Sequence, residues 1–403
     1  MIIGIDASRA NRPHKTGTEW YSFYLIKNLA LIDRTNQYRL YLNTPPTPEL
    51  AEIIKGRANF SFKFLSWPFG SFWTLGRLSL EMLIARPDVL FIPAHTMPLF
   101  SPRRTVNTIH DIAFVREQNL YRSRKIKVKM AFSRRLINFF IQLITFGKYR
   151  SDSVDYLYWS TAFALRRAGK IITVSDFTRQ EIISLYPKAK SSKIQVVHNG
   201  YNNQLFRPIH DQEKINSVLS KYSIESPYFL YVGRLEKKKN TPSLIEALAL
   251  IRENNPAISE KLILIGDASF GYDEVKYAID DFNLDSQVIM PGWVAEEDLP
   301  YIFNGASAFI FPSKHEGFGI PLLQAMACGI PVAASNISVF KEVADQAVLY
   351  FDQRDKYSIA AAMKTIVEDK ALRQELIAKG RQRVMNFSWE KCARETLKEL
   401  ENW

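Results

Sequence analysis

The sequence predicts an α/β protein with two doubly wound domains, because strand-like apolar runs alternate with helix-like stretches along its length. The chain has 403 residues, and 47% of them are hydrophobic, which is enough to fill two cores. The runs that predict the first sheet are Ile2–Asp6, Tyr38–Leu42, Val89–Ile92, Thr105–Ile109, Ile171–Val174 and Ile194–Val197. The runs that predict the second sheet are Tyr228–Val232, Leu262–Ile265, Val288–Met290, Ala308–Phe311 and Val332–Ala334. Ligands of such sheets bind beyond the carboxyl ends of the strands, so functional residues are expected there.

A turn-rich stretch and a proline mark the predicted boundary between the two domains. Asn199–Asn203 is rich in turn formers, and Phe206–Pro208 follows as the linker. We therefore expect a first domain at residues 1–207 and a second at 208–387. A last helix at 388–403 opens at Ser388, whose hydroxyl suits an N-cap.

Composition excludes several classes of protein. The only cysteines are Cys328 and Cys392, so neither a disulfide framework nor a zinc site is expected, and the chain fits a reducing cytosol. Residues 1–6 begin a buried strand at once, without the layout of a signal peptide. No apolar run reaches the roughly 18 residues of a spanning helix. No Gly-x-Gly-x-x-Gly follows the first strand, which argues against a dehydrogenase.

The most informative stretch is Lys314–Val332, which reads as loop, short helix and strand after an apolar run. Pro321 suits the start of that helix and Gly329 its end. The N–H groups of Gly317, Phe318, Gly319 and Ile320 would point out of the helix N-terminus, where the helix dipole favours a diphosphate. Glu316 stands in the loop as an acceptor of hydroxyl protons, and Gln324 lies one turn into the helix. This arrangement suits a sugar nucleotide.

The stretch resembles the signature of the retaining glycosyltransferases of family 4 (glycosyl transferases group 1), which have the GT-B fold. The resemblance implies two Rossmann-like domains with the active site in the cleft between them, and a last helix that returns to the first domain. The family usually has two glutamates eight positions apart, the first near the donor sugar and the second on the nucleotide ribose. Here they are Glu316 and an amide, Gln324, so donor binding is expected to be weakened or retuned but not abolished.

Two further segments resemble the family in its order along the chain. Residues 228–240 are similar to its Gly-Arg-Leu…Lys-Asn segment, which implies that Arg234 and Lys239 hold the donor diphosphate, whose charge grows as it departs. Lys237 and Lys238 read as a solvated basic turn. Residues 288–294 are similar to a segment that contacts the nucleotide base through its backbone, which places Val294 at the donor, before a helix from about Glu296.

The first domain offers fewer matches. Gly17 fits a family glycine that approaches the donor phosphate, although a lone glycine before a helix is equally typical of an ordinary loop. His110, with Asp111, is similar to the family's His-Asp pair, and it would bond a sugar hydroxyl near the reacting carbon. His95 is interpreted as structural or acceptor-side.

Most of the net charge of +12 comes from one segment, because Tyr121–Arg150 holds nine basic residues and no acidic one. Its apolar helical stretch, preceded by cations, is typical of a helix that lies in an anionic membrane interface. The alternative is a helix buried against its own domain. No base-reading module accompanies the charge, so nucleic acid is not expected.

We therefore expect a cytoplasmic enzyme that is peripherally associated with the inner face of the cell membrane. As a retaining hexosyltransferase it would use a nucleoside-diphosphate sugar of the GDP-mannose or UDP-glucose type as co-substrate. Its acceptor would be a lipid-linked or polysaccharide glycan in cell-surface glycan synthesis. No other cofactor is expected, and no Asp-x-Asp motif indicates a metal. The alternatives are a non-catalytic GT-B partner in a glycan-assembly complex and a sugar-nucleotide epimerase of the same fold.

Overall fold

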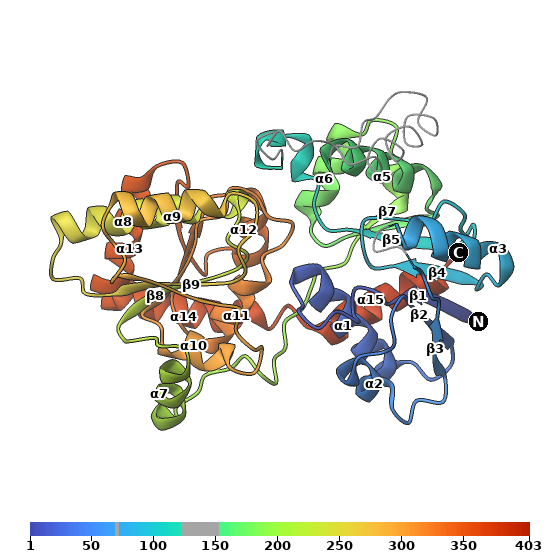
Figure 1. Cartoon of the computed structure of the whole chain (residues 1–403), viewed down its shortest axis with the longest axis horizontal. Coiled ribbons are helices and arrows are strands. Elements are labelled where there is room, and N and C mark those ends of the chain that lie inside the picture. Colours follow the sequence, from blue (N-terminus) through green and yellow to red (C-terminus); the bar gives the residue numbers. More distant parts are fainter. Residues whose placement is uncertain (69–71, 122–152) are drawn as a thin grey trace. The chain divides into compact units, whose positions relative to one another are not determined.

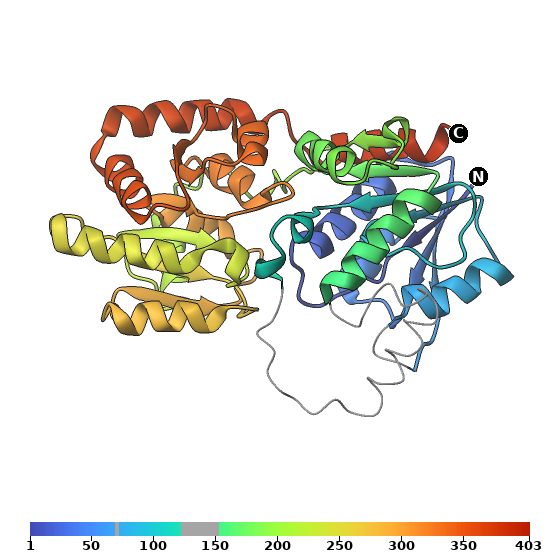
Figure 2. The same ribbon diagram turned by 90° about the horizontal axis from the view of Figure 1, so that it is seen from above.

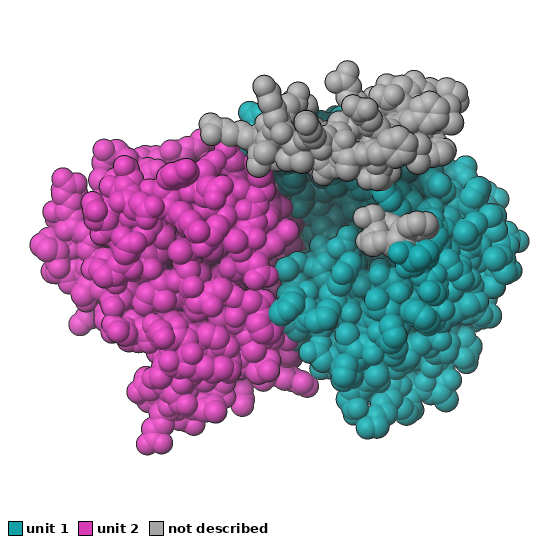
Figure 3. Space-filling model, viewed as in Figure 1, with its two compact units in different colours: residues 1–199, 389–403 teal, residues 200–388 magenta. Residues whose placement is uncertain are grey.

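The computed structural model describes residues 1–68, 72–121 and 153–403. They form two compact units, shown in different colours in Figure 3. Unit 1 comprises Met1–Asn199 and Trp389–Trp403, and unit 2 comprises Gly200–Ser388. The basic segment at 121–150, to which we assigned membrane docking, lies outside the described residues except for Tyr121.

Unit 1 is a seven-stranded parallel sheet with the strand order β3-β2-β1-β4-β5-β6-β7. Its strands are β1 (Ile2–Asp6), β2 (Gln37–Leu42), β3 (Phe60–Phe64), β4 (Val89–Ile92), β5 (Thr105–Ile109), β6 (Lys170–Thr173) and β7 (Ile194–Val196). Its helices are α1 (Gly17–Ile32), α2 (Pro48–Ile54), α3 (Ser79–Ile84), α5 (Ser153–Arg167), α6 (Asp176–Leu185) and α15 (Trp389–Glu401). Figure 1 shows α1, α2 and α15 on one face of this sheet and α5 on the other. The central strands β4 and β5 are buried throughout, as expected for strands covered on both faces.

Unit 2 is a six-stranded parallel sheet with the strand order β10-β9-β8-β11-β12-β13. Its strands are β8 (Tyr228–Val232), β9 (Lys261–Ile265), β10 (Val288–Gly292), β11 (Ala308–Phe311), β12 (Val332–Ser335) and β13 (Leu349–Phe351). Its helices are α7 (Gln212–Lys221), α8 (Thr241–Asn254), α9 (Tyr272–Asp281), α10 (Leu299–Gly305), α11 (Ile320–Cys328), α12 (Ser338–Ala344), α13 (Lys356–Glu368) and α14 (Lys370–Val384). Helices cover both faces of the sheet, with α8, α9 and α13 on one side and α10, α11 and α14 on the other (Figures 1 and 2). Both sheets are doubly wound, as the alternating pattern predicts.

The sequence missed one strand of each sheet, because neither has the pattern of a buried strand. Phe60–Phe64 lies at a sheet edge and is only partly buried, with Ser61 and Lys63 among its five residues. Leu349–Phe351 is a three-residue edge strand. The helix expected from about Glu296 begins later, at Leu299. The last helix begins at Trp389, directly after the predicted cap Ser388.

The division between the units falls after Asn199, earlier than the predicted boundary after residue 207. The predicted linker instead packs on unit 2. Phe206 is buried, and its ring centroid lies 5.9 Å from that of Phe303. Asn304 on α10 donates to the carbonyl of Arg207 (3.1 Å) and accepts from the N–H of Ile209 (2.8 Å).

The final helix packs on the first helix of unit 1. Trp389 opens α15, is buried, and stacks on Tyr24 of α1 with ring centroids 5.5 Å apart. Tyr21 of α1 contacts the same indole edge-on at 6.1 Å. At the other end of the contact, Asn36 donates to Glu401 (2.8 Å). Among the described residues, no helix is both long enough and apolar enough to cross a membrane.

Candidate active site

The candidate donor site of unit 2 lies at the carboxyl ends of two neighbouring strands, β8 and β11. The two strands pair in parallel, with Phe229 opposite Ala308 and Leu230 opposite Phe309. The sequence order reverses between them, because the sheet continues from β8 to β9 on one side and from β11 to β12 on the other. Such a switch point is where doubly wound sheets bind ligands. The loops that follow these strands carry most of the predicted donor residues.

Glu316, after β11, is held by two donors. Lys239 Nζ donates to its Oε1 at 2.5 Å, and the hydroxyl of Ser313 donates to the same oxygen at 2.8 Å. The Glu316 side chain is 10% exposed and that of Lys239 is 13% exposed. The structure thus joins two of the predicted catalytic residues in one buried ion pair.

The ion pair keeps Glu316 ionised. Burial alone would raise its pKa, but the ammonium groups of Lys239 and Lys238 and the bond from Ser313 outweigh burial and lower the pKa below its ordinary value. An ionised carboxylate is only an acceptor of hydrogen bonds. Glu316 is therefore suited to accept hydrogen bonds from hydroxyl groups and not to donate one.

Arg234, after β8, lies near a second carboxylate. Its Nη2 is 3.7 Å from Oε2 of Glu236, and its side chain is 47% exposed. Tyr231 on β8 donates to the Arg234 carbonyl at 3.1 Å, which fixes the backbone at the start of the loop. Arg234 therefore combines a fixed backbone with a side chain that a ligand can reach.

The predicted phosphate site is the N-terminus of helix α11. Gly319 is its N-cap, with φ +99°, a left-handed conformation that favours glycine, and Pro321 lies in the first turn. Gly329 ends the helix with φ +74°, as predicted. The first turn of an α-helix leaves N–H groups without intrahelical partners, and here it begins at Ile320, next to Gly317 and Phe318. Gln324, one turn further, is half-buried.

Val294 lies apart from these loops in sequence but on the same edge of the sheet. It follows the end of β10, is buried, and comes two residues after Gly292, whose φ of +78° turns the chain. A Cβ placed on Gly292 would have no heavy atom within 4 Å, so the backbone is open on that side.

In unit 1, Gly17 is the first residue of α1, and a Cβ placed on it would also meet nothing within 4 Å. The helix start is fixed by Glu19, whose Oε2 accepts from the hydroxyl of Thr16 (2.5 Å) and whose Oε1 accepts from Arg9 (3.0 Å). Burial opposes ionisation, but Thr16 and Arg9 lower the pKa of Glu19. The N-terminus of α1 is thus held by side-chain hydrogen bonds, with open space beside Gly17.

His110 follows the end of β5 and is half-buried. Its Nε2–H donates to the carbonyl oxygen of Pro93 (3.0 Å), and its ring meets that of Tyr21 edge-on at 4.7 Å. Since the carbonyl can only accept, Nδ1 is left as an acceptor. Burial lowers the pKa of His110 below 6.5, although Pro93 and Asp111 partly oppose it, so the ring is neutral at pH 7.

His95 contacts helix α5. Its Nε2 bonds the hydroxyl of Thr161 on α5, and burial lowers its pKa to about 4.

Two charged residues in the loop after β8 (the β8 loop), Glu236 and Lys238, were not predicted from the sequence as part of the site. The Lys238 side chain is only 12% exposed and lies 3.6 Å from Glu236, so it is not the solvated lysine that we expected. A run of three lysines gives no sign of which one turns inward. Lys237 does face outward, and it pairs with Glu274 of α9 at 2.8 Å. A glutamate directly before the lysines was the available signal.

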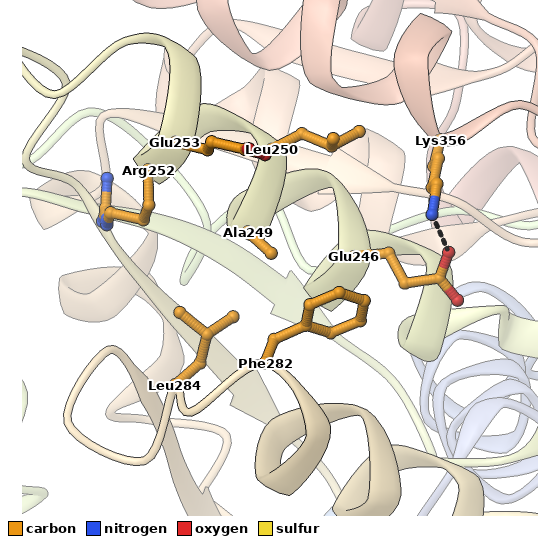
Figure 4. A pocket seen from close by; sticks show the side chains of 8 residues that line it. All are labelled: Glu246, Ala249, Leu250, Arg252, Glu253, Phe282, Leu284 and Lys356. Carbon is orange, nitrogen blue, oxygen red and sulfur yellow. Dashed lines mark ion pairs between the residues drawn. The ribbon is translucent and has the colours of Figure 1, made fainter.

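A separate pocket of about 400 Å³ lies on the α8 and α13 side of unit 2 (Figure 4). It is lined by Glu246, Ala249, Leu250, Arg252, Glu253, Phe282, Leu284 and Lys356. The Lys356–Glu246 ion pair, at 3.4 Å, lies on its rim, and none of the predicted site residues lines it.

Solved structures share the architecture over essentially the whole chain. Sucrose-phosphate synthase from Thermosynechococcus elongatus matches with a TM-score of 0.71 at 20% identity, over 98% of this chain and 97% of that one. Anabaena HepE in complex with UDP and glucose matches with a TM-score of 0.71 at 18% identity, over 100% and 99%. The chain has the GT-B glycosyltransferase fold.

Two family models divide the sequence between them. "Glycosyltransferase Family 4" matches residues 16–205, and "Glycosyl transferases group 1" matches residues 212–383. The O-antigen chain mannosyltransferase B of Escherichia coli is 29% identical over 385 residues, which cover 95% of each chain. This chain belongs to the family 4 glycosyltransferases.

Proposed function

We propose that the protein is a retaining glycosyltransferase that moves a hexose from a nucleoside-diphosphate sugar to a lipid-linked or polysaccharide glycan in cell-surface glycan synthesis. The observation that carries this proposal is the Lys239–Glu316 pair, which joins the loop after β8, where the exposed Arg234 also lies, to the loop that leads into α11. One carboxylate acceptor for sugar hydroxyls thus adjoins cations and N–H donors for a diphosphate.

In the proposed reaction the bond between the anomeric carbon and the diphosphate breaks, and the acceptor oxygen bonds that carbon from the same face. Arg234, Lys239 and the N–H groups of Gly317–Ile320 stabilise the charge that gathers on the leaving diphosphate. The acceptor proton passes to an oxygen of that phosphate, so no separate general base is required. No metal enters this scheme.

The remaining roles are those that the family resemblance implies, and the chemistry of each group supports them. Glu316 accepts from donor sugar hydroxyls, and Nδ1 of neutral His110 accepts from a hydroxyl near the reacting carbon. Gln324 bonds the nucleotide ribose, and Gly17 admits the diphosphate close to the backbone. Val294 supports the base through its main chain.

The donor is of the GDP-mannose or UDP-glucose type. A mannosyl donor is supported by the E. coli relative. That protein is an O-antigen chain mannosyltransferase, and the match covers 95% of its length. A glucosyl donor is supported by the HepE complex with UDP and glucose, although that likeness is one of fold. A thermal-shift panel of nucleotide sugars separates the two, since a ligand at one hundred times its Kd stabilises the fold by about 2.7 kcal/mol.

A non-catalytic partner and an epimerase remain as alternatives, because Gln324 replaces the second glutamate of the family signature. Slow release of nucleoside diphosphate from the bound donor, without acceptor, is the expected result for a transferase. A protein that binds the donor but releases no nucleoside diphosphate, with or without glycan acceptors, would be a non-catalytic partner. Conversion of the donor sugar into its epimer would identify an epimerase.

A further inference from the structure

Glu236 is a second carboxylate in the donor loop that the proposed mechanism does not use. Its side chain is 12% exposed. Oε2 lies 3.7 Å from Nη2 of Arg234, and Oε1 lies 3.6 Å from Nζ of Lys238. The carboxylate therefore stands between two cations, one of which faces the proposed diphosphate.

The backbone around Glu236 is fixed from several sides. The N–H of Leu235 donates to the Asp267 carbonyl, and that of Lys237 donates to the Phe270 carbonyl, both at 2.9 Å. Lys314, two residues before Glu316, donates its N–H to the Lys238 carbonyl at 2.9 Å. The β8 loop is thus fastened both to the loop after β9 and to the loop that carries Glu316, so Glu236 keeps a set position.

The two loops form an alternating set of charges. Arg234, Glu236 and Lys238 make one part, and Lys239 and Glu316 make the other. The parts are coupled, because Lys238 helps to lower the pKa of Glu316. The pKa of Tyr231 is raised chiefly by burial, and Glu316 and Glu236 both raise it further. Three cations and two carboxylates leave an excess of one positive charge, which is small beside the charge of a nucleoside diphosphate.

We propose that Glu236 is a positioning residue that holds Arg234 and Lys238 in place and limits how tightly the product nucleoside diphosphate binds. This inference rests on the proposed function, since it assigns the loop's ligand to a nucleoside diphosphate. A carboxylate this close to the cations attracts them and repels the diphosphate. Binding energy that holds the product as firmly as the transition state adds nothing to turnover. Glu236 therefore favours release of the product nucleoside diphosphate, and it also keeps the Arg234 side chain positioned for the diphosphate.

Glu236→Gln tests this proposal, with isothermal titration of GDP and UDP and with steady-state turnover as readouts. We expect the variant to bind the nucleoside diphosphate about three- to tenfold more tightly, because one nearby negative charge is lost. Its kcat should fall by at least a similar factor. A purely structural role would instead weaken binding and lower the melting temperature. Glu236→Asp keeps the charge and should stay near wild-type affinity, even if the Gln variant folds poorly.

Glu274→Gln is the matched control. It removes a carboxylate from the same unit, but Glu274 pairs outward with Lys237 and its side chain is 48% exposed. It should leave affinity and kcat unchanged. An equal gain in affinity in both Gln variants, or no gain in Glu236→Gln, would overturn the role of Glu236. If wild-type protein binds neither GDP nor UDP, the proposed function itself is wrong, and this inference falls with it.

Discussion

At the residue scale, the two cations of the proposed donor site differ in how closely a carboxylate already pairs with each of them. Lys239 is 13% exposed and forms a short ion pair with Glu316, whereas Arg234 is 47% exposed and lies 3.7 Å from Glu236. A ligand can therefore recruit Arg234 without breaking a short ion pair. This difference makes Arg234 the residue whose charge is most available to a departing diphosphate.

Arg234→Ala should lower kcat more than it weakens donor binding, because the charge it opposes is largest in the transition state. The expected cost is about 2–4 kcal/mol in the barrier, or roughly 30- to 1000-fold in turnover. Steady-state kinetics with the preferred donor measures it. Lys237→Ala is the control in the same loop, since Lys237 pairs outward with Glu274. Near-normal turnover in Arg234→Ala would remove Arg234 from the site.

The environment of His95 predicts how stability depends on pH. The pKa of His95 is lowered to about 4, chiefly by burial, so below its unfolded value of about 6.5 the unfolded chain binds the proton first. The contribution of neutral His95 to the free energy of unfolding is therefore complete above about pH 6.5. It is lost as the pH falls toward 4, by up to about 1.4 kcal/mol per pH unit. Urea unfolding at pH 7, 6 and 5 measures the slope, and His95→Gln should flatten it. An unchanged slope in that variant would mean that His95 is not buried neutral.

The residues that could be predicted from the sequence are those that belong to a recognisable motif. Residues that become largely buried only in the folded loop could not be predicted. Glu316 and Lys239, predicted separately, form an ion pair in the structure. Lys238 was interpreted as solvated, because nothing in Lys237–Lys239 says which lysine the short turn directs into the protein. Glu236 was missed for the same reason, since its role depends on Lys238.

At the element scale, two helix N-termini carry the proposed diphosphate contacts, and their glycines are there for different reasons. Gly319 has φ +99°, and a Cβ on it would lie 2.9 Å from Cε1 of Phe340. Gly17 is the first residue of α1, and a Cβ on it would meet nothing within 4 Å. The first glycine is required by its own backbone, and the second is required only if a ligand comes close.

Alanine at each position separates these reasons. Gly319→Ala should lower the free energy of unfolding by about 1–2 kcal/mol, the cost of a left-handed residue with a Cβ. Gly17→Ala should leave stability unchanged or slightly higher, yet reduce turnover if the donor approaches this backbone. Urea denaturation and donor turnover are measured on both variants. Full activity in Gly17→Ala would exclude the proposed role of Gly17.

The elements most predictable from sequence were those buried on both faces. Ala308–Phe311 is entirely buried, and its apolar run was recognised together with the helix bounded by Pro321 and Gly329. Phe60–Phe64 was missed although it alternates aromatic with polar residues, the pattern of a half-buried strand, because it lacks the continuous apolar run of a strand covered on both faces. The boundary between the units, after Asn199, was also not predicted. The sequence around Phe206 is typical of a linker, and only the contact of Phe206 with Phe303 shows that it belongs to unit 2.

At the scale of the whole molecule, the chain returns to unit 1 through Trp389, which anchors α15 on Tyr21 and Tyr24. Trp389→Ala should cost about 3–5 kcal/mol in unfolding free energy, as for other buried tryptophans. Trp403→Ala, at the far end of the same segment, is the matched control and should cost much less, because Trp403 is 42% exposed. Chemical denaturation checks both. Equal losses would mean that Trp389 is not the anchor.

The central claim is that Glu316 reads the donor sugar while its neighbours hold the diphosphate, and Glu316→Ala tests this most directly. The measurement compares binding of the free nucleoside diphosphate with transfer from the intact donor, in wild-type and variant protein. Because Glu316 is assigned to the sugar, the variant should bind the nucleoside diphosphate at least as well as wild type and lose nearly all transfer. A variant that transfers at the wild-type rate, or that loses nucleoside diphosphate binding while remaining folded, would contradict the account.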